Sequence, residues 1–539
     1  MSKTGVKYQV NTMDTTSNLM TIKQAGKWAS ELLGRNITPS NISYLIQYGR
    51  IKRVTEDGNT WISKEDLIKY YESYHAKRET EWVRKLGDDL NWSLSFDHLK
   101  EAETTKHVHR LHPYKGKFIP QLVEYFLDNH VNDFKKDVYF KKGDTILDPF
   151  CGSGTALVQA NELGMHSIGI DVSSFNALIS NVKTNKYNLV DLHSEVLRVT
   201  STLREFVSNS NTVKFESSLK EALANFNTRY FPSPEFKLGV RAGDINEEEY
   251  GAEKENDFKL IYDTLVAQYN IDLSLEDNGT FLNKWYMKHV RCEIDFVKSL
   301  IEQISDQDIR NVLVVVLSRT IRSCRATTHF DLATLKDPVT STYYCHKHGK
   351  ICKPLFSIVS WWVRYSKDTI ERLAQFDKLR TDTHQVCLTG DSRTINIVKE
   401  LEKNDQFLAR LIKDQGIKGI FSSPPYVGLI DYHDQHAYAY DLFHFERKDQ
   451  LEIGPLSSGQ GADARESYIR AISEVLNNCI KYLANDYDVF LVANDKYDLY
   501  PLIAEKANMQ IVNRHKRPVL NRTERDKGAY SETIFHLKG

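Results

Sequence analysis

The chain has 539 residues and a formal net charge of −1 at pH 7, so no strongly basic field covers the whole protein and any nucleic-acid surface must be local. This length has room for about three to four domain-sized units. The strongest apolar run, residues 312–317, is far too short to cross a bilayer, and the polar start lacks the apolar segment of a signal peptide. Seven cysteines, an odd number, do not predict a dense disulfide framework. We therefore expect a cytoplasmic protein without a membrane anchor.

Residues 1–75 have the pattern of a small separate module. Thr21 is a candidate N-cap before the apolar-periodic stretch IKQAGKWASELL, and a second short helix is expected after residues 38–41. Residues 58–74 then predict a turn, a strand and a third helix. That order resembles winged helix-turn-helix domains of the excisionase and MerR type. Such a module either reads bases or only packs against other parts of the chain.

The rest of the chain alternates strands and helices, with one long interruption. In residues 76–190, the strand TILD, a glycine-containing loop, the helix ALVQANELG and the strand SIGID follow one another. Residues 386–539 return to this alternation, whereas residues 191–385 are mixed and contain long helical patterns. The pattern predicts an α/β fold with a doubly wound sheet, formed by residues 76–190 and 386–539, with an insertion between the halves.

A candidate cofactor site follows the strand TILD. Small residues in its loop let the backbone turn tightly and approach a ligand, and the next helix directs free N–H groups toward it. Asp171, followed by Val172, ends the second strand, where a carboxylate can accept both hydroxyls of a ribose. The glycines alone could form an ordinary turn, but the whole unit predicts a nucleoside-type cofactor. The loop consists of Asp148, Pro149, Phe150, Cys151, Gly152, Ser153, Gly154 and Thr155.

Three strings resemble motifs of the amino-directed DNA methyltransferases, which bind S-adenosylmethionine (SAM). DPFCGSGT followed by GIDVS is similar to motifs I and II of that family. HPYKGKFIP, residues 112–120, looks like motif X, which implies that His112, Lys117 and Phe118 lie at the methionine end of the cofactor. Asp391 and Ser392 match the position whose carboxylate accepts a hydrogen bond from the adenine amine. Without the resemblance, residues 112–118 could be a basic surface loop and Asp391 a simple N-cap.

The string Ser423-Pro424-Pro425-Tyr426 follows an apolar strand and resembles motif IV of the same family. An exocyclic amine is a poor nucleophile because its lone pair is delocalised into the ring. Hydrogen bonds to Ser423 Oγ and to the Pro424 carbonyl would favour a pyramidal nitrogen, and the two prolines hold that carbonyl rigidly. Tyr426 offers a face on which an extruded base can stack. These four residues are therefore the predicted catalytic residues.

The resemblance implies a class I SAM methyltransferase with a Rossmann-like, mixed seven-stranded sheet. It also implies a site-specific enzyme acting on a flipped base of double-stranded DNA, beside a restriction endonuclease or another defence system. Serine in motif IV favours cytosine N4, whereas the motif order, X, I, II, insertion, III and IV, resembles the α-type adenine N6 enzymes. Two further interpretations stay open: an RNA guanine-N2 methyltransferase, and a DNA-binding regulator whose methylase domain has decayed.

The insertion, residues 191–385, is the expected target-recognition domain. Residues 310–380 contain 13 Lys or Arg and five acidic residues, interleaved with aromatic ones, which suits contacts to phosphates and bases. Arg319, Arg322 and Arg325 recur every three residues and would lie along one side of a helix. Together with Lys347 and Lys350 they are the predicted DNA-binding residues. The alternative is a solvated basic helix.

A second feature of the insertion is YYCHKHGKIC, which contains Cys345, His348 and Cys352, with Cys324 about twenty residues before it. Thiolates and imidazoles are zinc ligands, but this spacing matches no standard zinc finger. We therefore expect free buried thiols and assign no metal, with a structural zinc as the alternative.

Overall fold

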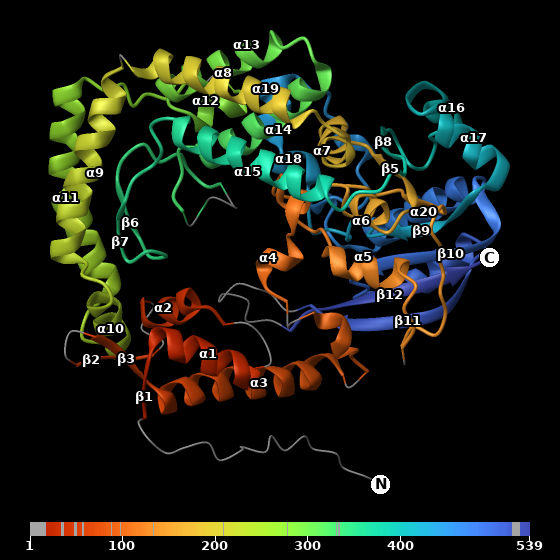
Figure 1. Ribbon diagram of the computed structural model, residues 1–539, viewed down its shortest axis with the longest axis horizontal. Coiled ribbons are helices and arrows are strands. Elements are labelled where there is room, and N and C mark those ends of the chain that lie inside the picture. Colours follow the sequence, from red (N-terminus) through yellow and green to blue (C-terminus); the bar gives the residue numbers. More distant parts are fainter. Residues whose placement is uncertain are drawn as a thin grey trace. The chain divides into compact units, whose positions relative to one another are not determined.

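The computed structural model describes residues 18–539 except 34–36, 48–50, 57–58, 88, 97–98, 133, 209, 277–278, 330, 332–334 and 520–528. The chain forms two compact units, Met1–Lys85 with Phe226–Glu253 and Leu86–Asn225 with Lys254–Gly539. Each unit is described by itself below (Figure 1).

The N-terminal module consists of three helices and a small antiparallel sheet. Strand β1 (Leu19–Thr21) leads into helices α1 (Ile22–Leu33) and α2 (Pro39–Gln47), then strands β2 (Arg53–Glu56) and β3 (Asn59–Ser63), and helix α3 (Lys64–Leu86). The sheet order is β1-β3-β2. Thr21 caps α1 as predicted: its Oγ1 accepts from the Gln24 N–H at 3.3 Å, and Gln24 Oε1 accepts from the Thr21 N–H at 2.9 Å. The predicted helices and the strand before the third helix appear in the expected order, and β1 and β2 are additional. The winged helix-turn-helix resemblance and a base-reading role stay predictions. The expected boundary at residue 75 falls inside α3.

The larger unit contains a mixed seven-stranded sheet in the order β11-β12-β10-β9-β4-β5-β8. Its strands are β4 (Thr145–Asp148), β5 (His166–Asp171), β8 (Gln385–Thr389), β9 (Ile417–Ser422), β10 (Leu483–Ala493), β11 (Gln510–Pro518) and β12 (Ser531–Lys538). Strands β10, β9, β4, β5 and β8 pair in parallel, and β12 is antiparallel to both of its neighbours. The chain therefore builds the predicted doubly wound sheet, with the order reversing between β4 and β9.

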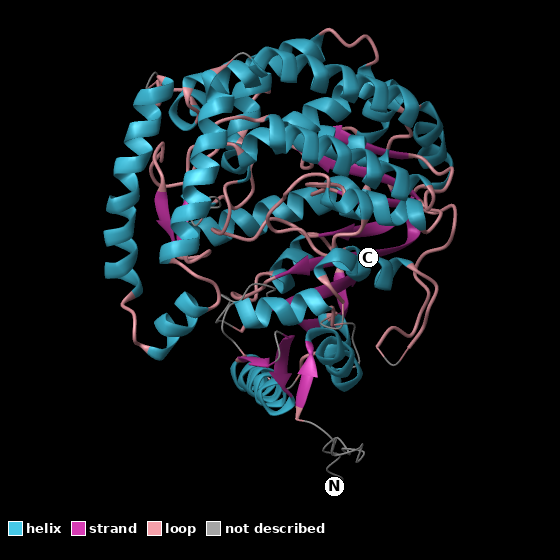
Figure 2. Ribbon diagram, turned by 60° about the vertical axis from the view of Figure 1, so that its left-hand side comes forward, coloured by secondary structure: helices cyan, strands magenta, loops and turns pink. Residues whose placement is uncertain are grey.

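Helices cover both faces of this sheet (Figure 2). Along β4, Ile146 and Leu147 are both buried but belong to different hydrophobic clusters, as expected where side chains alternate between faces. The cluster around Leu147 includes residues of α16 (Ile397–Asn404), α17 (Gln406–Gln415), α20 (Ala462–Ile480) and α21 (Tyr500–Lys506). The cluster around Ile146 includes residues of α5 (Pro120–Leu127) and α6 (Thr155–Glu162). Because both faces of the sheet are buried, its strands appear in the sequence as short continuous apolar runs.

The predicted insertion is mainly helical and follows α7 (Ser174–Thr184). Its elements are α8 (Leu189–Ser208), α9 (Asn211–Tyr230), α10 (Glu235–Ala242), α11 (Glu247–Tyr269), α12 (Phe281–Trp285), α13 (Lys288–Glu302), α14 (Gln307–Ser323), α15 (Val359–Asp377), and a hairpin of β6 (Tyr343–Cys345) and β7 (Lys350–Cys352). Residues 226–253 of this stretch belong to the smaller unit. The shorter helices α4 (Glu101–Thr104), α18 (Tyr432–Gln435) and α19 (Ala437–Phe443) lie outside the insertion.

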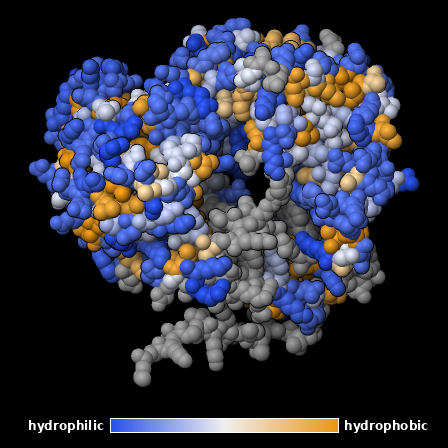
Figure 3. Space-filling model, turned by 180° about the vertical axis from the view of Figure 1, so that it is seen from behind, coloured by the Kyte–Doolittle hydropathy of each residue, from blue (hydrophilic) through white to orange (hydrophobic). Residues whose placement is uncertain are grey.

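The surface is predominantly polar on the face seen in Figure 3, with scattered apolar residues. Among the helices that the structure describes, none combines the length and the apolar character needed to span a bilayer. Residues 1–17, on which the expectation of no signal peptide depends, lie outside the described part of the chain.

Candidate active site

A pocket opens at the carboxyl ends of β4, β5, β8 and β9, beside the point where the strand order reverses. Open α/β sheets bind their ligands at this position. Its volume is about 860 Å³, including the open mouth. Fourteen of the predicted site residues line it: Lys117, Phe118, Pro149, Phe150, Cys151, Gly152, Ser153, Thr155, Asp171, Val172, Asp391, Ser392, Ser423 and Pro425.

The loop between β4 and α6 has the close approach that its glycines predict. Gly152 has φ +51°, and a Cβ added there would lie 2.9 Å from Tyr114 Oη. Gly154 has φ +73° and caps α6, where a Cβ would lie 2.9 Å from Ser180. Ser153 Oγ is buried without a hydrogen-bond partner, although it belongs to a residue that lines the pocket. A polar ligand in the pocket would satisfy it, so the loop fits the predicted cofactor.

Asp148 lies behind this loop and connects two central strands. Its carboxylate accepts a hydrogen bond from Ser422 Oγ, the last residue of β9, at 2.5 Å, and one from the Phe150 N–H at 3.2 Å. Burial raises the pKa of Asp148 to about 7. The residue is outside the pocket lining, and its contacts indicate that it holds the ends of β4 and β9 together.

Asp171 is fixed at the end of β5 by three donors. Gly152 N–H donates to Oδ2 at 2.8 Å, and Ser173 N–H and Asn176 Nδ2 donate to Oδ1 at 2.8 and 3.1 Å. Burial nevertheless raises the pKa of Asp171 to about 6. The carboxylate lines the pocket in a fixed orientation, with acceptor capacity left for hydroxyl groups.

The segment resembling motif X divides into a part that lines the pocket and a part behind it. Lys117 and Phe118 line the pocket, and Lys117 Nζ donates to the His109 carbonyl at 2.6 Å. Burial lowers the pKa of Lys117 to about 8. His112 is fully buried behind the pocket, where its ring packs edge-on against Phe175 and His436. The geometry therefore gives His112 a packing position rather than one in the lining.

The residues after β8 contribute a second carboxylate. Asp391 lines the pocket and forms a bidentate ion pair with Arg393, with N–O distances of 2.7 to 3.0 Å. Ser392 Oγ donates to the Pro149 carbonyl at 2.6 Å, which ties this loop to the loop after β4. Arg393 was not predicted from the sequence, because its pairing with a residue two positions away depends on the loop conformation.

The predicted catalytic residues follow β9 directly. Ser423 and Pro425 line the pocket. Ser423 Oγ donates to the Val492 carbonyl at 3.0 Å, so its lone pairs remain free to accept. Tyr426 lies outside the lining, and its hydroxyl donates to Glu532 Oε1 at 2.8 Å. Sequence reasoning thus located the strand end correctly, but the four residues do not all face the pocket.

Several lining residues were missed by the sequence analysis. Tyr114 lies within the predicted motif X but was not assigned a role, and the segment after Tyr426 contributes Tyr432, His433, Leu451, Glu452 and Ile453. Further lining residues without a predicted role adjoin predicted ones in the chain or follow β5: Gly116, Ile170, Ser173, Asn176 and Gly390. Glu452 accepts from the His433 N–H at 2.7 Å and also contacts the His433 ring. Nothing in the pattern of residues 451–453 indicated a lining position.

The structure separates the five predicted DNA-binding residues. Arg319 is buried, pairs with Asp368 at 2.6 Å and lies 4.1 Å from the Tyr365 ring centre. Arg325 is also buried and lies beyond the end of α14, so the three arginines do not follow one helix side as expected.

Arg322 is half-buried. The burial of His436, and next the nearby charge of Arg322, lower the pKa of His436 to about 3. Lys347 and Lys350 are exposed at the turn of the β6–β7 hairpin. Of the five predicted DNA-binding residues, Lys347 and Lys350 are the exposed ones.

The sheet order, the glycine loop after β4 and the carboxylates after β5 and β8 define a class I SAM-dependent methyltransferase. A family model described as DNA methylase matches residues 20–181. The type II methyltransferase M.MjaII of Methanocaldococcus jannaschii is 44% identical over 524 residues, which cover 96% of this chain and 97% of that protein. The chain therefore belongs to the type II DNA methyltransferases of the amino-methyltransferase family. Its cofactor is SAM, and DNA is the substrate expected for this family.

Two further relatives match only a part of this chain. The type II methyltransferase M.BsoBI of Geobacillus stearothermophilus is 35% identical over 107 residues, 19% of each chain. A tRNA (guanine(10)-N2)-dimethyltransferase of Methanocaldococcus jannaschii is 35% identical over 77 residues, 14% of this chain and 22% of that protein. The solved structure of the rRNA methyltransferase aviRa from Streptomyces viridochromogenes has 9% sequence identity and a TM-score of 0.28. The match covers 82% of this chain and 94% of the aviRa chain. A score this low adds nothing to the assignment.

Proposed function

We propose that this enzyme methylates the exocyclic N4 amine of a cytosine within a specific site of double-stranded DNA, with the target base turned out of the stack. The observation that carries the proposal is Ser423, which lies in the pocket lining directly before two prolines. Serine at this position favours cytosine. Adenine N6 is the alternative, because the order of the motifs along the chain resembles that of adenine enzymes.

Ser423 and Pro424 would activate the amine by hydrogen bonding. The Ser423 proton is engaged by the Val492 carbonyl at 3.0 Å, which leaves the oxygen lone pairs to accept an amine N–H. The Pro424 carbonyl would accept the second N–H, and the proline rings restrict the rotation that would move it away. Accepting both protons favours a pyramidal nitrogen whose lone pair is available for attack.

SAM supplies, when bound, a methyl group on a positively charged sulfur. The chain's own contribution is to hold the ends of the cofactor so that amine and methyl are in line, which removes much of the entropic barrier. Asp171 would accept from the ribose hydroxyls, Asp391 from the adenine amine, and Lys117 would face the methionine end. A covalent intermediate with a cysteine is not required by this reaction.

Tyr426 is the proposed stacking face for the extruded base. Its hydroxyl donates to Glu532 at 2.8 Å, and this contact would fix the ring orientation beside the end of β9. An aromatic ring held at both ends loses little entropy when a base stacks on it.

We propose the turn of the β6–β7 hairpin, with Lys347 and Lys350, as a phosphate-contacting surface. Replacing both lysines by alanine should reduce the slope of log Kd against log salt by about 2, because each phosphate contact releases about one counterion. Lys399→Ala with Lys506→Ala removes the same charge from exposed positions on α16 and α21 and should leave the slope unchanged. Equal slopes for both double variants would contradict the assignment.

The reaction is tested by incubating the purified protein with methyl-labelled SAM and unmethylated bacterial DNA, followed by digestion and identification of the modified nucleoside. N4-methylcytosine is the expected product. N6-methyladenine would leave the reaction standing and refute the choice of base. No label in DNA of diverse sequence, with SAM binding intact, would refute the proposed substrate.

Ser423→Ala is the matching variant. By analogy with the removal of one positioned hydrogen-bonding group, we expect kcat to fall by about 10²–10³-fold while SAM binding persists. Ser194→Ala, at an exposed position on α8, is the control and should retain full activity. A DNA-binding regulator with an inactive methylase domain would show no catalytic difference between the two variants.

An RNA guanine amine is the second candidate substrate, favoured by the 77-residue similarity to a tRNA guanine-N2 enzyme. That class usually has aspartate or asparagine where this chain has Ser423. Label in RNA but not in DNA would establish it. The similarity to type II methyltransferases supports, as a further proposal, a partner restriction endonuclease.

A further inference from the structure

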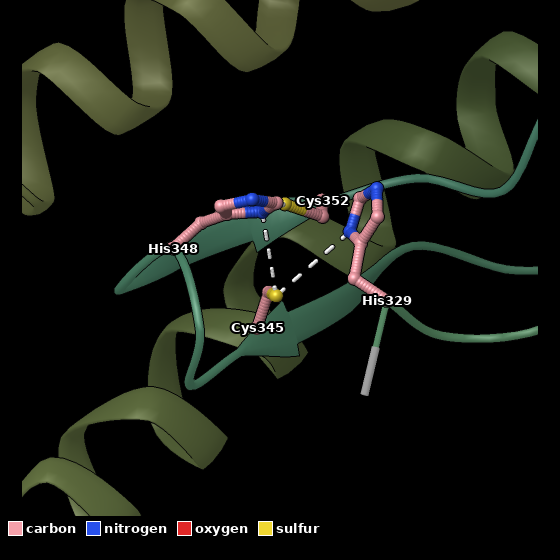
Figure 4. A group of neighbouring side chains, drawn as sticks. All are labelled: His329, Cys345, His348 and Cys352. Atoms are coloured by element: carbon pink, nitrogen blue, oxygen red, sulfur yellow. Dashed lines mark hydrogen bonds between the residues drawn. The ribbon is translucent and has the colours of Figure 1, made fainter. Parts of the chain in front are cut away.

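The β6–β7 hairpin of the insertion brings four metal-ligating side chains together. His329, Cys345, His348 and Cys352 each offer a nitrogen or sulfur atom, and all of these atoms lie within 4.8 Å of one another (Figure 4). We propose that these four residues bind a structural zinc ion. The sequence indicated three of them; His329 is added by the fold.

The distances between the ligand atoms fit a tetrahedral zinc site. His348 Nδ1 lies 3.5 Å from Cys345 Sγ and 3.4 Å from Cys352 Sγ, and His329 Nδ1 lies 3.8 Å from Cys345 Sγ. With Zn–S of about 2.3 Å and Zn–N of about 2.0 Å, tetrahedral geometry separates a bound sulfur from a bound nitrogen by about 3.5 Å. The ion could therefore enter this cluster with shifts of a few tenths of an ångström in these three separations.

The hairpin turn produces this arrangement. The N–H groups of His348 and Gly349 both donate to the Cys345 carbonyl, at 3.0 and 2.6 Å, and Gly349 has φ +61°. The chain thereby folds back so that the His348 ring lies over Cys345 and Cys352 (Figure 4). His329, from the segment after α14, approaches from the other side, so the ion would join this segment to the hairpin.

The hairpin is small, and a bound ion would add to its stability. Its strands contain three residues each, and two-stranded hairpins of this size are marginal alone. The buried cluster here consists of Tyr343, Cys345 and Cys352, with Val339 packed against it. Small units of this kind are commonly held by a metal, whose binding energy becomes folding energy.

The chemistry of the set indicates a structural rather than a catalytic ion. Four protein ligands complete a tetrahedral zinc and leave no position for water or substrate. None of the four belongs to the described lining of the SAM pocket. The Tyr343 hydroxyl lies 2.9 Å from His329 Nδ1, so coordination would either replace that hydrogen bond or use Nε2 after a ring flip, with the tyrosine orienting the ring.

The site also bears on DNA binding, a consequence that rests on the proposed function. Lys347 lies inside the turn between the ligands Cys345 and Cys352, and Lys350 begins β7. An ion that fixes the turn would hold both lysines in one orientation, which lowers the entropic cost of contacting phosphates.

The test is the metal content of the purified full-length protein, measured by mass spectrometry, which is expected to be about one zinc per chain. Cobalt substitution should give the visible bands of a tetrahedral site together with a thiolate-to-cobalt charge-transfer band. Cys345→Ser and Cys352→Ser should lose the metal. Cys292→Ser, which removes an exposed thiol on α13, should retain it.

His329→Cys keeps the proposed site falsifiable if the serine variants do not fold, because a three-cysteine, one-histidine set also binds zinc. It should retain the metal, whereas His329→Ala should release it more readily to a chelator. Wild-type protein that remains metal-free after incubation with zinc, or a cobalt form without thiolate bands, would overturn the proposal. A disulfide between Cys345 and Cys352 would overturn it as well. Metal content is measured independently of methylation, so it would still test the zinc site if the proposed function were wrong.

Discussion

Replacing Asp171 by asparagine should weaken SAM binding, whereas two opposing effects on the stability of the fold partly cancel. In the wild type, three donors converge on this carboxylate, two on Oδ1 and the Gly152 N–H on Oδ2. The asparagine oxygen can occupy the Oδ1 position, which leaves the amide NH₂ facing the Gly152 N–H. An unsatisfied buried donor costs about 1–3 kcal/mol.

An opposing effect comes from the charge itself. Burial raises the pKa of Asp171 from 3.8 to about 6, so ionising it in the folded protein opposes folding by roughly 3 kcal/mol. Since the folded-state pKa is above the unfolded value, this group stabilises the fold at low pH and loses that contribution between about pH 4 and 6. The neutral amide avoids the penalty, so we expect the free energy of unfolding at neutral pH to change by no more than about 2 kcal/mol.

SAM binding has no such compensation. Hydrogen bonds to a charged acceptor contribute about 1.5–3 kcal/mol and those to a neutral one about 0.5–1.5 kcal/mol, so two ribose hydroxyls should lose about 1–3 kcal/mol in total. This corresponds to roughly a 5- to 150-fold increase in Kd, measurable by titration calorimetry. The control is Asp414→Asn, which changes an exposed carboxylate on α17.

The dependence of Kd on pH gives a second check. Wild-type affinity should rise between about pH 5 and 7 as Asp171 ionises, and the affinity of Asp171→Asn should not. If the folded variant binds SAM within about twofold of wild type, the assignment of this carboxylate to the cofactor is wrong.

Three further predictions concern single residues. Gly152→Ala should reduce both thermal stability and SAM affinity, because the new Cβ would lie 2.9 Å from Tyr114 Oη. The control Gly143→Ala is also at positive φ but has nothing within 4 Å, so it should show only backbone strain of about 1–2 kcal/mol. Equal losses of stability in the two variants would contradict the predicted contact with Tyr114. Burial lowers the pKa of Lys117 to about 8, so the SAM affinity of the wild type should fall between about pH 7 and 9, and that of Lys117→Met should not. If calorimetry gives the same dependence of Kd on pH for both proteins, this prediction is wrong. Arg319→Ala should lower the free energy of unfolding by about 1–3 kcal/mol, because its ion pair is lost, and should leave the Kd of the folded protein for DNA unchanged. Weaker DNA binding with an unchanged free energy of unfolding, measured in denaturant, would show that Arg319 contacts DNA.

The sequence by itself determined the class of sheet and the place of the site. Short apolar strands each end in a residue that needs a ligand or a tight turn: Asp148 before the glycine loop, Asp171, and Ser423 after β9. Local chemistry defines these positions, because a strand end, a positive φ and a proline pair depend on residues within a few positions. The parallel pairing of the strands then brings their carboxyl ends to one edge.

Only the tertiary structure decided which side chains face the pocket and which are buried against partners inside the protein. Arg319 and Arg325 have the spacing of a binding surface, yet they are buried, because a charge pattern does not reveal the internal partner, here Asp368 for Arg319. Conversely, residues 451–453 line the pocket although no local pattern marks them. Such positions depend on packing between segments far apart in the chain, which no short window of sequence contains.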